Sequence, residues 1–299
     1  PPEQVILMPT STEKNCNTSP TAASAGTDLN GAAAVEACRT IRARLEAWAA
    51  ARFAGDGLVE SCGHVGFAGG WVYDTRRPAM RMAFGDLCAA ARRDRLDLGA
   101  RGFYATPIAG FDPAAGRGAP FFYYTQGAAA AEVCIDRFTG DLTVVRADIL
   151  IDIGRSINPG VDRGQVIGGF IQGMGWVTGE CLVYDERGTL LSDSPTTYKI
   201  PAASDVPADF RCDFFPNDDN VENVARSKAV GEPPLMHAIC VWAAVKHALS
   251  GVSPEAARRL CLPATGEEIL RALSVAGGPT VSGGAWGHSA AVRHWSRAR

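Results

Sequence analysis

The chain has 299 residues, 46% of them hydrophobic, which is enough to bury the core of one large domain or two smaller ones. Its formal net charge is -3, so the chain lacks the excess of Lys and Arg that binding to a nucleic-acid backbone requires. No segment approaches the ~18 consecutive apolar residues of a membrane-spanning helix, and the first residues do not resemble a signal peptide. We therefore expect neither a nucleic-acid nor a membrane partner, and a cytoplasmic location.

Nine cysteines are spread along the chain, and the closest pair, Cys240 and Cys261, is 21 positions apart. This spacing excludes CxxC pairs, so neither a zinc knuckle nor a typical iron–sulfur run is encoded. An odd number of cysteines without a signal peptide is typical of reduced, mostly buried thiols. The five histidines show no HExxH or similar spacing, so we assign no protein-bound metal to them.

The first 120 residues predict one long helix among shorter elements. Val5–Met8 is strand-like, and residues 54–82, rich in Gly and Arg, predict turns with short strands. A second helix is expected over Phe84–Arg95. Thr27 or Asp28 can cap the long helix, whose apolar face recurs at helical spacing through Cys38, Ile41, Leu45 and Trp48.

Beyond residue 120 the pattern changes to extended structure. Residues 121–154 predict a long hairpin with its turn at Thr139–Asp141. A helix follows over Asp162–Cys181, and its five glycines imply close packing on backbone or on a ligand, because each costs ~1 kcal/mol relative to Ala. A further helix begins at Pro233-Pro234 and runs through Leu249. The Gly-, Ser- and Arg-rich tail after Gly277 is expected to be disordered.

Three segments could carry chemistry. The small residues of Asn17–Gly26 expose backbone N–H groups ahead of a helix and could cradle a phosphate, although an ordinary capped loop fits the same pattern. Glu232, held between Gly231 and two prolines, could be a preorganised general base or simply an acidic helix cap. Gln165 and Gln172 lie seven residues apart on one face of a helix and could bind a flat heteroaromatic group, although Gly-rich helices also serve only for packing.

Together these segments resemble the molybdopterin-binding domain of the xanthine dehydrogenase and aldehyde oxidase family, in the same order along the chain. The resemblance spans about residues 5–273 and implies an α+β fold, the second half of the molybdenum-cofactor-binding domain. It makes residues 1–273 one domain and residues 274–299 a disordered tail. The matching motifs are Pro20–Gly26 with Asp28–Gly31, Gly102–Pro107, Asp152–Pro159, Asp162–Gly175, Thr197–Pro201 and Ser227–Pro234.

The resemblance implies hydroxylation of an electron-poor carbon with oxygen derived from water, and it makes Glu232 the general base. It places the backbone of Ala23 near molybdenum, without any side-chain ligand from the protein. It further implies that molybdenum-molybdopterin contacts Thr21, Ala22, Ala23, Ser24, Gly26, Gln165 and Gly231. This chain departs from the family pattern at Ile167, where the family often has a Glu. The absence of that acidic side chain is expected to change packing or a neighbouring contact.

A larger departure concerns the parts that complete the family's pocket. A second pterin-contacting Gln, the substrate-orienting Arg and Glu, and the aromatic residues that sandwich the substrate do not occur here, and the chain begins Pro1-Pro2 without Met, as in a fragment or processed product. The resemblance therefore implies partners: the upstream half of the domain, an iron–sulfur/FAD subunit carrying the 2Fe-2S and FAD groups, and an oligomeric complex. The isolated chain is expected to be inactive.

The sequence alone leaves the substrate open. Met174–Trp176 and Thr197–Lys199 favour the xanthine branch, which oxidises hypoxanthine and xanthine to urate. An aldehyde oxidase or another molybdenum hydroxylase is an alternative, because the substrate-selecting residues are largely missing. A truncated, non-catalytic relic that binds no cofactor is an alternative of a different class.

Overall fold

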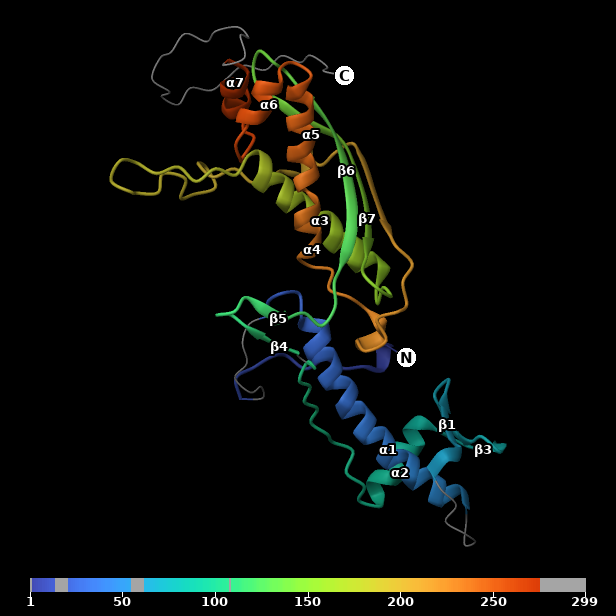
Figure 1. Ribbon diagram of the computed structural model, residues 1–299. Coiled ribbons are helices and arrows are strands. Elements are labelled where there is room, and N and C mark those ends of the chain that lie inside the picture. The colour runs from blue at the N-terminus through green and yellow to red at the C-terminus, as the bar shows by residue number, and fades with distance from the viewer. Residues whose placement is uncertain (1, 14–20, 55–61, 108, 275–299) are drawn as a thin grey trace. The chain divides into compact units, whose positions relative to one another are not determined.

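The computed structural model describes residues 2–13, 21–54, 62–107 and 109–274. The chain divides into two compact units, Pro1–Pro120 and Phe121–Arg299 (Figure 1). The expected disordered tail therefore lies almost entirely outside the described residues, as do Cys16 and part of the small-residue run.

A 23-residue helix, α1 (Ala32–Ala54), is the main element of the first unit. It follows directly on a π-helical turn at Thr27–Gly31, so the long helix predicted here is confirmed, with its start a few residues later than a cap at Thr27 or Asp28 implies. Its buried face packs with the sheet and the second helix around one small core. That core contains Leu45, Ala49, Phe53, Val65, Val72, Leu87 and Ala91.

The strands of the first unit form two separate antiparallel sheets, β1–β2–β3 and β4–β5. The predicted short strands within residues 54–82 are confirmed in the described part, and α2 confirms the expected second helix. The bounds are β1 Val65–Ala68, β2 Trp71–Asp74, β3 Arg77–Ala83, α2 Phe84–Arg93, β4 Ala109–Asp112 and β5 Arg117–Ala119, with 3₁₀ turns at Pro2–Gln4 and Cys62–His64.

The strand expected at Val5–Met8 does not form. These four residues belong to no element, and their side chains are between 68% and 89% exposed. A strand is stabilised by the hydrogen bonds and cross-strand contacts of a partner, and no described segment supplies one here. The prediction was therefore wrong for this chain, although the apolar residues that prompted it are present.

The second unit is built on a three-stranded sheet of β6 (Gln126–Ile135), β7 (Leu142–Asp152) and β8 (Asp209–Phe214). The first two strands are antiparallel and confirm the predicted hairpin, whose turn contains Gly140 at φ +77°. The third strand runs parallel to β7, and parallel neighbours need a crossover connection. Here α3 (Pro159–Thr178) lies within that connection.

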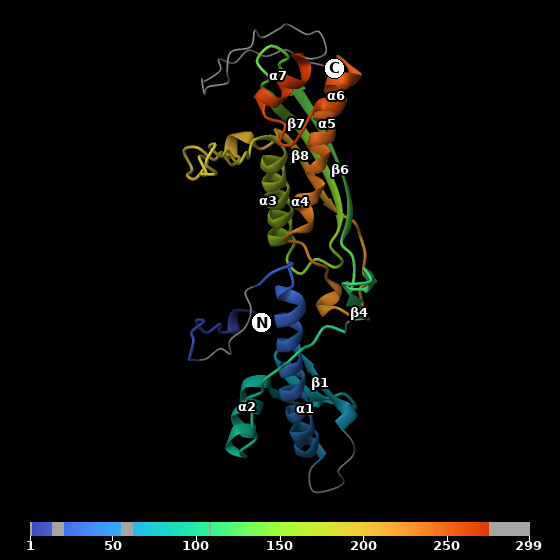
Figure 2. The same cartoon turned by 60° about the vertical axis from the view of Figure 1, so that its left-hand side comes forward.

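Helices cover one face of this sheet (Figure 2). Buried residues of α3 and α5 pack there against alternate residues of β7 such as Ile149 and Ile151. The helix predicted from Pro233 is present but is divided at Ala238 into two pieces. The bounds are α4 Pro233–His237, α5 Ile239–Ser250, α6 Pro254–Arg259 and α7 Gly266–Ser274, with 3₁₀ turns at Ala203–Asp205 and Val224–Arg226.

The opposite face of the sheet carries ion pairs. Arg146 on β7 binds Asp148 at 2.6 Å, and Arg211 on β8 binds Asp209 at 2.8 Å. Such a polar face is typical of a sheet that packs helices on only one side. None of the described helices is both long and apolar enough to cross a membrane.

The seven cysteines whose side chains the structure describes are free thiols, as expected. The expectation that they are mostly buried was wrong for this set, because only Cys212 is buried and three are exposed: Cys38, Cys181 and Cys261. Cys38 belongs to the predicted apolar face of α1, but the core of the first unit begins further along the helix at Ile41 and Leu45.

Candidate functional site

Two glycines of α3 bring the backbone that carries Glu232 close to this helix. A Cβ atom at Gly173 would lie 2.3 Å from the Leu235 carbonyl oxygen, and one at Gly169 would lie 3.3 Å from the Gly231 carbonyl oxygen. At Gly173 only glycine allows α4 to approach so closely, and at Gly169 the approach is tight. The predicted packing of backbone on backbone is thus confirmed at these two positions, and it places Gly231 beside α3.

Another face of α3 is open. No other described atom lies within 4 Å of a Cβ placed at Gly164 or Gly168. Gln165 lies between them, is exposed, and makes no side-chain hydrogen bond to another described residue. Gln172 is also exposed, so the prediction that both glutamines share one outer face is confirmed. A free amide beside two glycines leaves room for a planar ligand to approach the helix backbone.

Glu232 occupies the N-cap position of α4, with φ -93° and ψ -35°. Its side chain is exposed and makes no capping hydrogen bond to the first turn of that helix. A carboxylate that served as a cap would accept from those amides. The acidic-cap alternative is therefore not supported by the geometry. Gly231 beside it is half-buried, and Gly169 on α3 is four residues after Gln165, so the structure brings Gln165, Gly231 and Glu232 into one region.

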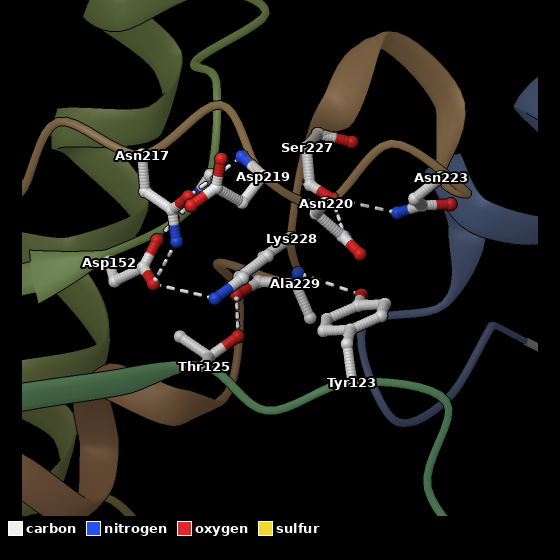
Figure 3. Close-up of polar contacts among 11 residues, drawn as sticks. Tyr123, Thr125, Asp152, Asn217, Asp219, Asn220, Asn223, Ser227, Lys228 and Ala229 are labelled. Atoms are coloured by element: carbon white, nitrogen blue, oxygen red, sulfur yellow. Dashed lines mark hydrogen bonds and ion pairs between the residues drawn. The ribbon is translucent and has the colours of Figure 1, made fainter.

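The segment leading to Glu232 is tied to the end of β7. The Lys228 amide donates to the Ile153 carbonyl at 2.8 Å, and the Lys228 ammonium binds Asp152 Oδ2 at 2.5 Å (Figure 3). The same carboxylate accepts from the Gly154 amide at 2.9 Å and from the Asn217 side chain at 2.7 Å. Burial by itself raises the pKa of Asp152, but the hydrogen bonds to its carboxylate, led by that of Lys228, outweigh burial and lower the pKa below its ordinary value.

The neighbouring residues are bonded from the other side. The Ala229 amide donates to the Tyr123 hydroxyl at 2.8 Å, and the Ala229 carbonyl accepts from Thr125 Oγ1 at 2.9 Å (Figure 3). The Ser227 carbonyl accepts from the side chains of Asn220 and Asn223. The backbone of residues 227–229 is therefore held by hydrogen bonds from three directions, only three residues before Glu232.

A strained turn begins this bonded segment. Ala225 and Arg226 have φ values of +51° and +62°, and the Ser227 amide closes the turn on the Val224 carbonyl at 3.0 Å. Two central residues with positive φ are the pattern of a type I′ turn, which usually contains Gly, Asn or Asp. Non-glycine residues adopt this conformation only where the surrounding structure enforces it, and such positions cluster at functional sites.

The small-residue loop of the first unit has the same kind of turn. Ala23 and Ser24 have φ values of +53° and +54°, and the Ala25 amide donates to the Ala22 carbonyl at 3.2 Å. Thr21, Ala22 and Ala23 are exposed, whereas a Cβ at Gly26 would come within 3.3 Å of the Thr21 methyl group. The loop thus presents exposed backbone just ahead of a helix, and Asn17–Pro20 lie outside the described residues.

The predicted site residues therefore divide between the two units. Residues 21–26 belong to the first, while Gln165, Gly231 and Glu232 belong to the second, where Gly231 lies against Gly169, about one helical turn after Gln165. Ile167, which departs from the family pattern, is half-buried and packs against the core of the second unit. The described residues contain no cluster of three or more His, Cys, Asp or Glu side chains that could hold a metal ion.

Sequence reasoning missed the pair formed by Asp152 and Lys228. Both residues lie in motifs singled out for their resemblance, but nothing in their spacing of 76 positions pairs them. The available signal was an Asn- and Asp-rich stretch, Asn217–Asn220, just before a Lys that leads into an apolar, Gly- and Pro-containing segment. Such residues usually indicate turns, which left the hydrogen bonds from Asn217 to the Asp152 carboxylate and from Asn220 to the Ser227 carbonyl unrecognised.

The chain is similar to known proteins over most of its length. A family model described as molybdopterin cofactor-binding domain matches residues 1–207. Xanthine dehydrogenase of Oryza sativa subsp. japonica is 39% identical over 283 residues, and xanthine dehydrogenase/oxidase of Felis catus is 38% identical over 279. Each alignment covers 91% of this chain but only 19% of the relative.

Solved structures show the same fold. The Cu,Mo-CO dehydrogenase matches with a TM-score of 0.72 at 23% identity, over 89% of this chain and 31% of the other. Quinoline 2-oxidoreductase from Pseudomonas putida 86 matches with a TM-score of 0.67 at 25% identity, over 84% and 30%. These likenesses confirm the expected α+β fold. The chain belongs to the molybdopterin cofactor-binding domain family and corresponds to about one fifth of the length of the xanthine dehydrogenases that it resembles.

Proposed function

We propose that this chain is part of a molybdenum hydroxylase that acts on a purine, with Glu232 as the general base of the reaction. The observation that carries the proposal is the position of Glu232. Its carboxylate is exposed, does not cap α4, and follows a segment whose backbone is hydrogen-bonded from three directions. A base that must accept a proton in one fixed geometry needs such support.

The residues that would hold molybdenum-molybdopterin have fitting surroundings. Gln165 offers a free amide beside the open faces of Gly164 and Gly168, where no described atom fills the space. Thr21, Ala22, Ala23, Ser24 and Gly26 offer the backbone of an exposed turn before a helix, where anions bind well. When bound, the cofactor supplies the two-electron redox chemistry of a hydroxylation whose oxygen derives from water.

The role of the chain itself is to accept a proton and to orient the reactants. In this proposal Glu232 Oε takes the proton from the oxygen nucleophile as that oxygen approaches the substrate carbon. Gly231 gives the reactants close access to the backbone. The substrate is a purine, xanthine or hypoxanthine, because curated relatives such as those of rice, mouse and Arabidopsis thaliana, 37–41% identical, are xanthine dehydrogenases or xanthine dehydrogenase/oxidases.

The remaining functions are assigned to other regions or chains. The chain covers 19% of its rice relative, and it contains no cysteine cluster for an iron–sulfur centre. We therefore propose that an upstream half-domain completes the pocket, and that 2Fe-2S and FAD groups on an associated iron–sulfur/FAD part carry the electrons away in an oligomeric, cytoplasmic complex.

The test is Glu232→Gln in the holoenzyme, because glutamine keeps the shape but cannot accept the proton. Removing a positioned general base costs ~10²–10⁴-fold in rate, so kcat is expected to fall by that factor at unchanged molybdenum content. The matched control is Glu222→Gln, at an exposed glutamate ten positions upstream. A Glu232→Gln enzyme that keeps its metal and reduces it with xanthine at more than about a tenth of the wild-type rate contradicts the assignment.

A further inference from the structure

We propose that Lys228 and Asp152, together with Tyr123 and Thr125, form a clamp that positions Glu232 for proton transfer. The proposal rests on the assignment of Glu232 as the base. None of the four clamp residues is itself assigned a contact with cofactor or substrate, so they are positioning residues.

The clamp acts on the backbone, which is what a positioning role requires. Lys228 is fixed twice, by its amide to the Ile153 carbonyl and by its ammonium to Asp152. Ala229 is fixed twice as well, through its amide by Tyr123 and through its carbonyl by Thr125. The two sets of partners come from the end of β7 and from the segment just before β6; in Figure 3 Asp152 lies to the left of Lys228 and Ala229, and Thr125 and Tyr123 lie below them.

Packing fixes the short segment between the clamp and the base. Val230 is half-buried and packs against the core of the second unit. The Gly231 carbonyl oxygen would be 3.3 Å from a Cβ at Gly169, so Gly231 lies directly against α3. Glu232 is therefore attached to a segment that is hydrogen-bonded at residues 227–229 and packed at residues 230–231, and a shift of the clamp displaces its carboxylate.

The Lys228–Asp152 pair is better suited to orienting the backbone segment than to increasing the stability of the fold. The Lys228 and Asp152 side chains are only 12% and 11% exposed, and the Lys228 ammonium donates a charge-assisted hydrogen bond to the Asp152 carboxylate. A well-packed apolar pair at such a site is often as stable as the ion pair, because both charges must lose their hydration. An apolar pair, however, makes no directional hydrogen bond that could orient the backbone. The Asp152 carboxylate also accepts hydrogen bonds from the Gly154 amide and the Asn217 side chain, so it joins the loop 217–228 to the end of β7.

The first experiment uses the 299-residue chain and measures amide hydrogen exchange, which needs no cofactor. Lys228→Met is expected to speed exchange of the Lys228 and Ala229 amides at least tenfold, because it removes one of the two bonds that tie this segment to β7. Lys228→Arg keeps a charged donor and is expected to retain most of the protection. Asp148→Asn is the matched control, since Asp148 is an ion-paired aspartate on the same strand, four residues from Asp152.

The second experiment uses the holoenzyme. Lys228→Met is expected to lower kcat at least ~10-fold at unchanged molybdenum content and with KM within about twofold, because a displacement of about 1 Å can cost ~10² in rate. Lys228→Arg is expected to recover most of this loss, and Asp148→Asn to remain near wild type. The double variant Lys228→Met/Asp152→Leu is expected to restore the unfolding midpoint but not kcat, whereas a merely structural pair would restore both.

Three results overturn the proposal: unchanged amide exchange at residues 228–229 in Lys228→Met, wild-type kcat in Lys228→Met, or wild-type kcat in the double variant. Failure of the underlying assignment is recognised separately. If Glu232→Gln keeps its turnover, Glu232 is not the base, and the positioning role falls even where the exchange data still show a clamp on residues 227–229. If Glu232→Gln loses turnover while Lys228→Met keeps it, the base stands and the clamp is rejected.

Discussion

Replacing Gly173 with alanine should destabilise the second unit by pushing α4 away from α3. The added Cβ would lie 2.3 Å from the Leu235 carbonyl oxygen and 2.8 Å from the Ala238 Cβ. Neither atom is the end of a flexible side chain, so relief requires a shift of backbone. Overpacking of this kind typically costs ~1–3 kcal/mol, and the short distances here place the expected cost near the upper end.

Gly164→Ala is the matched control, because it lies in the same helix and no other described atom is within 4 Å of its added Cβ. Alanine gains about 1 kcal/mol over glycine at any interior helix position. This gain is common to both variants and cancels in their comparison. The difference between their free energies of unfolding therefore isolates the clash and should be about 1–3 kcal/mol.

Urea unfolding of the 299-residue chain, followed by far-UV circular dichroism, measures this difference. With a denaturant slope of about 2 kcal/mol/M, the midpoint of Gly173→Ala should lie about 0.5–1.5 M below that of Gly164→Ala. Equal midpoints would refute the conclusion that Gly173 is required for the close approach of α4. Because α4 begins at Pro233, the same substitution should also lower kcat in the holoenzyme by moving Glu232.

Three further predictions concern cofactor, activity and pH. The isolated 299-residue chain should neither retain molybdenum cofactor stoichiometrically nor oxidise xanthine; turnover by the purified, metal-loaded chain would show that the pocket is complete. Ala23→Leu should lower molybdenum content in the holoenzyme by adding bulk to an exposed turn, while Ala23→Gly, which suits the φ of +53°, should leave it unchanged; equal content in both variants would place Ala23 away from the cofactor. The folded-state pKa of Asp152 lies below its ordinary 3.8, so its contribution to stability is present above about pH 4 and is lost as pH falls through the lower value. Urea unfolding from about pH 6 to about pH 3 should therefore show a steeper loss for wild type than for Asp152→Asn, and parallel curves would contradict this.

Local sequence signals were sufficient for most of the elements. The apolar spacing through Ile41 and Leu45 predicted α1, and the Thr139–Asp141 turn predicted the hairpin of β6 and β7. Pro233-Pro234 predicted the start of α4, and the helix predicted over Asp162–Cys181 is α3, which begins three residues earlier at Pro159 and ends at Thr178. These features depend on hydrogen bonds and side chains only a few positions apart, so the residues themselves determine them.

The resemblance of ordered motifs pointed to the family, and the comparisons confirm it. Residue types also indicated that the glycines of α3 must meet backbone or ligand. The sequence could not say which glycine does which: Gly169 and Gly173 admit α4, whereas Gly164 and Gly168 remain open on another face. That distinction depends on where a segment some 60 positions later returns to the helix.

Only the tertiary structure decided the features that depend on distant partners. Val5–Met8 has the composition of a strand, but a strand requires a neighbour, and none of the described segments pairs with it. Asp152 and Lys228 are 76 positions apart, and each taken alone reads as an ordinary charged residue. Their pairing arises because β7 and the segment before α4 are packed side by side, so the support of Glu232 is a property of the fold, whereas its identity as a candidate base was already apparent from the sequence.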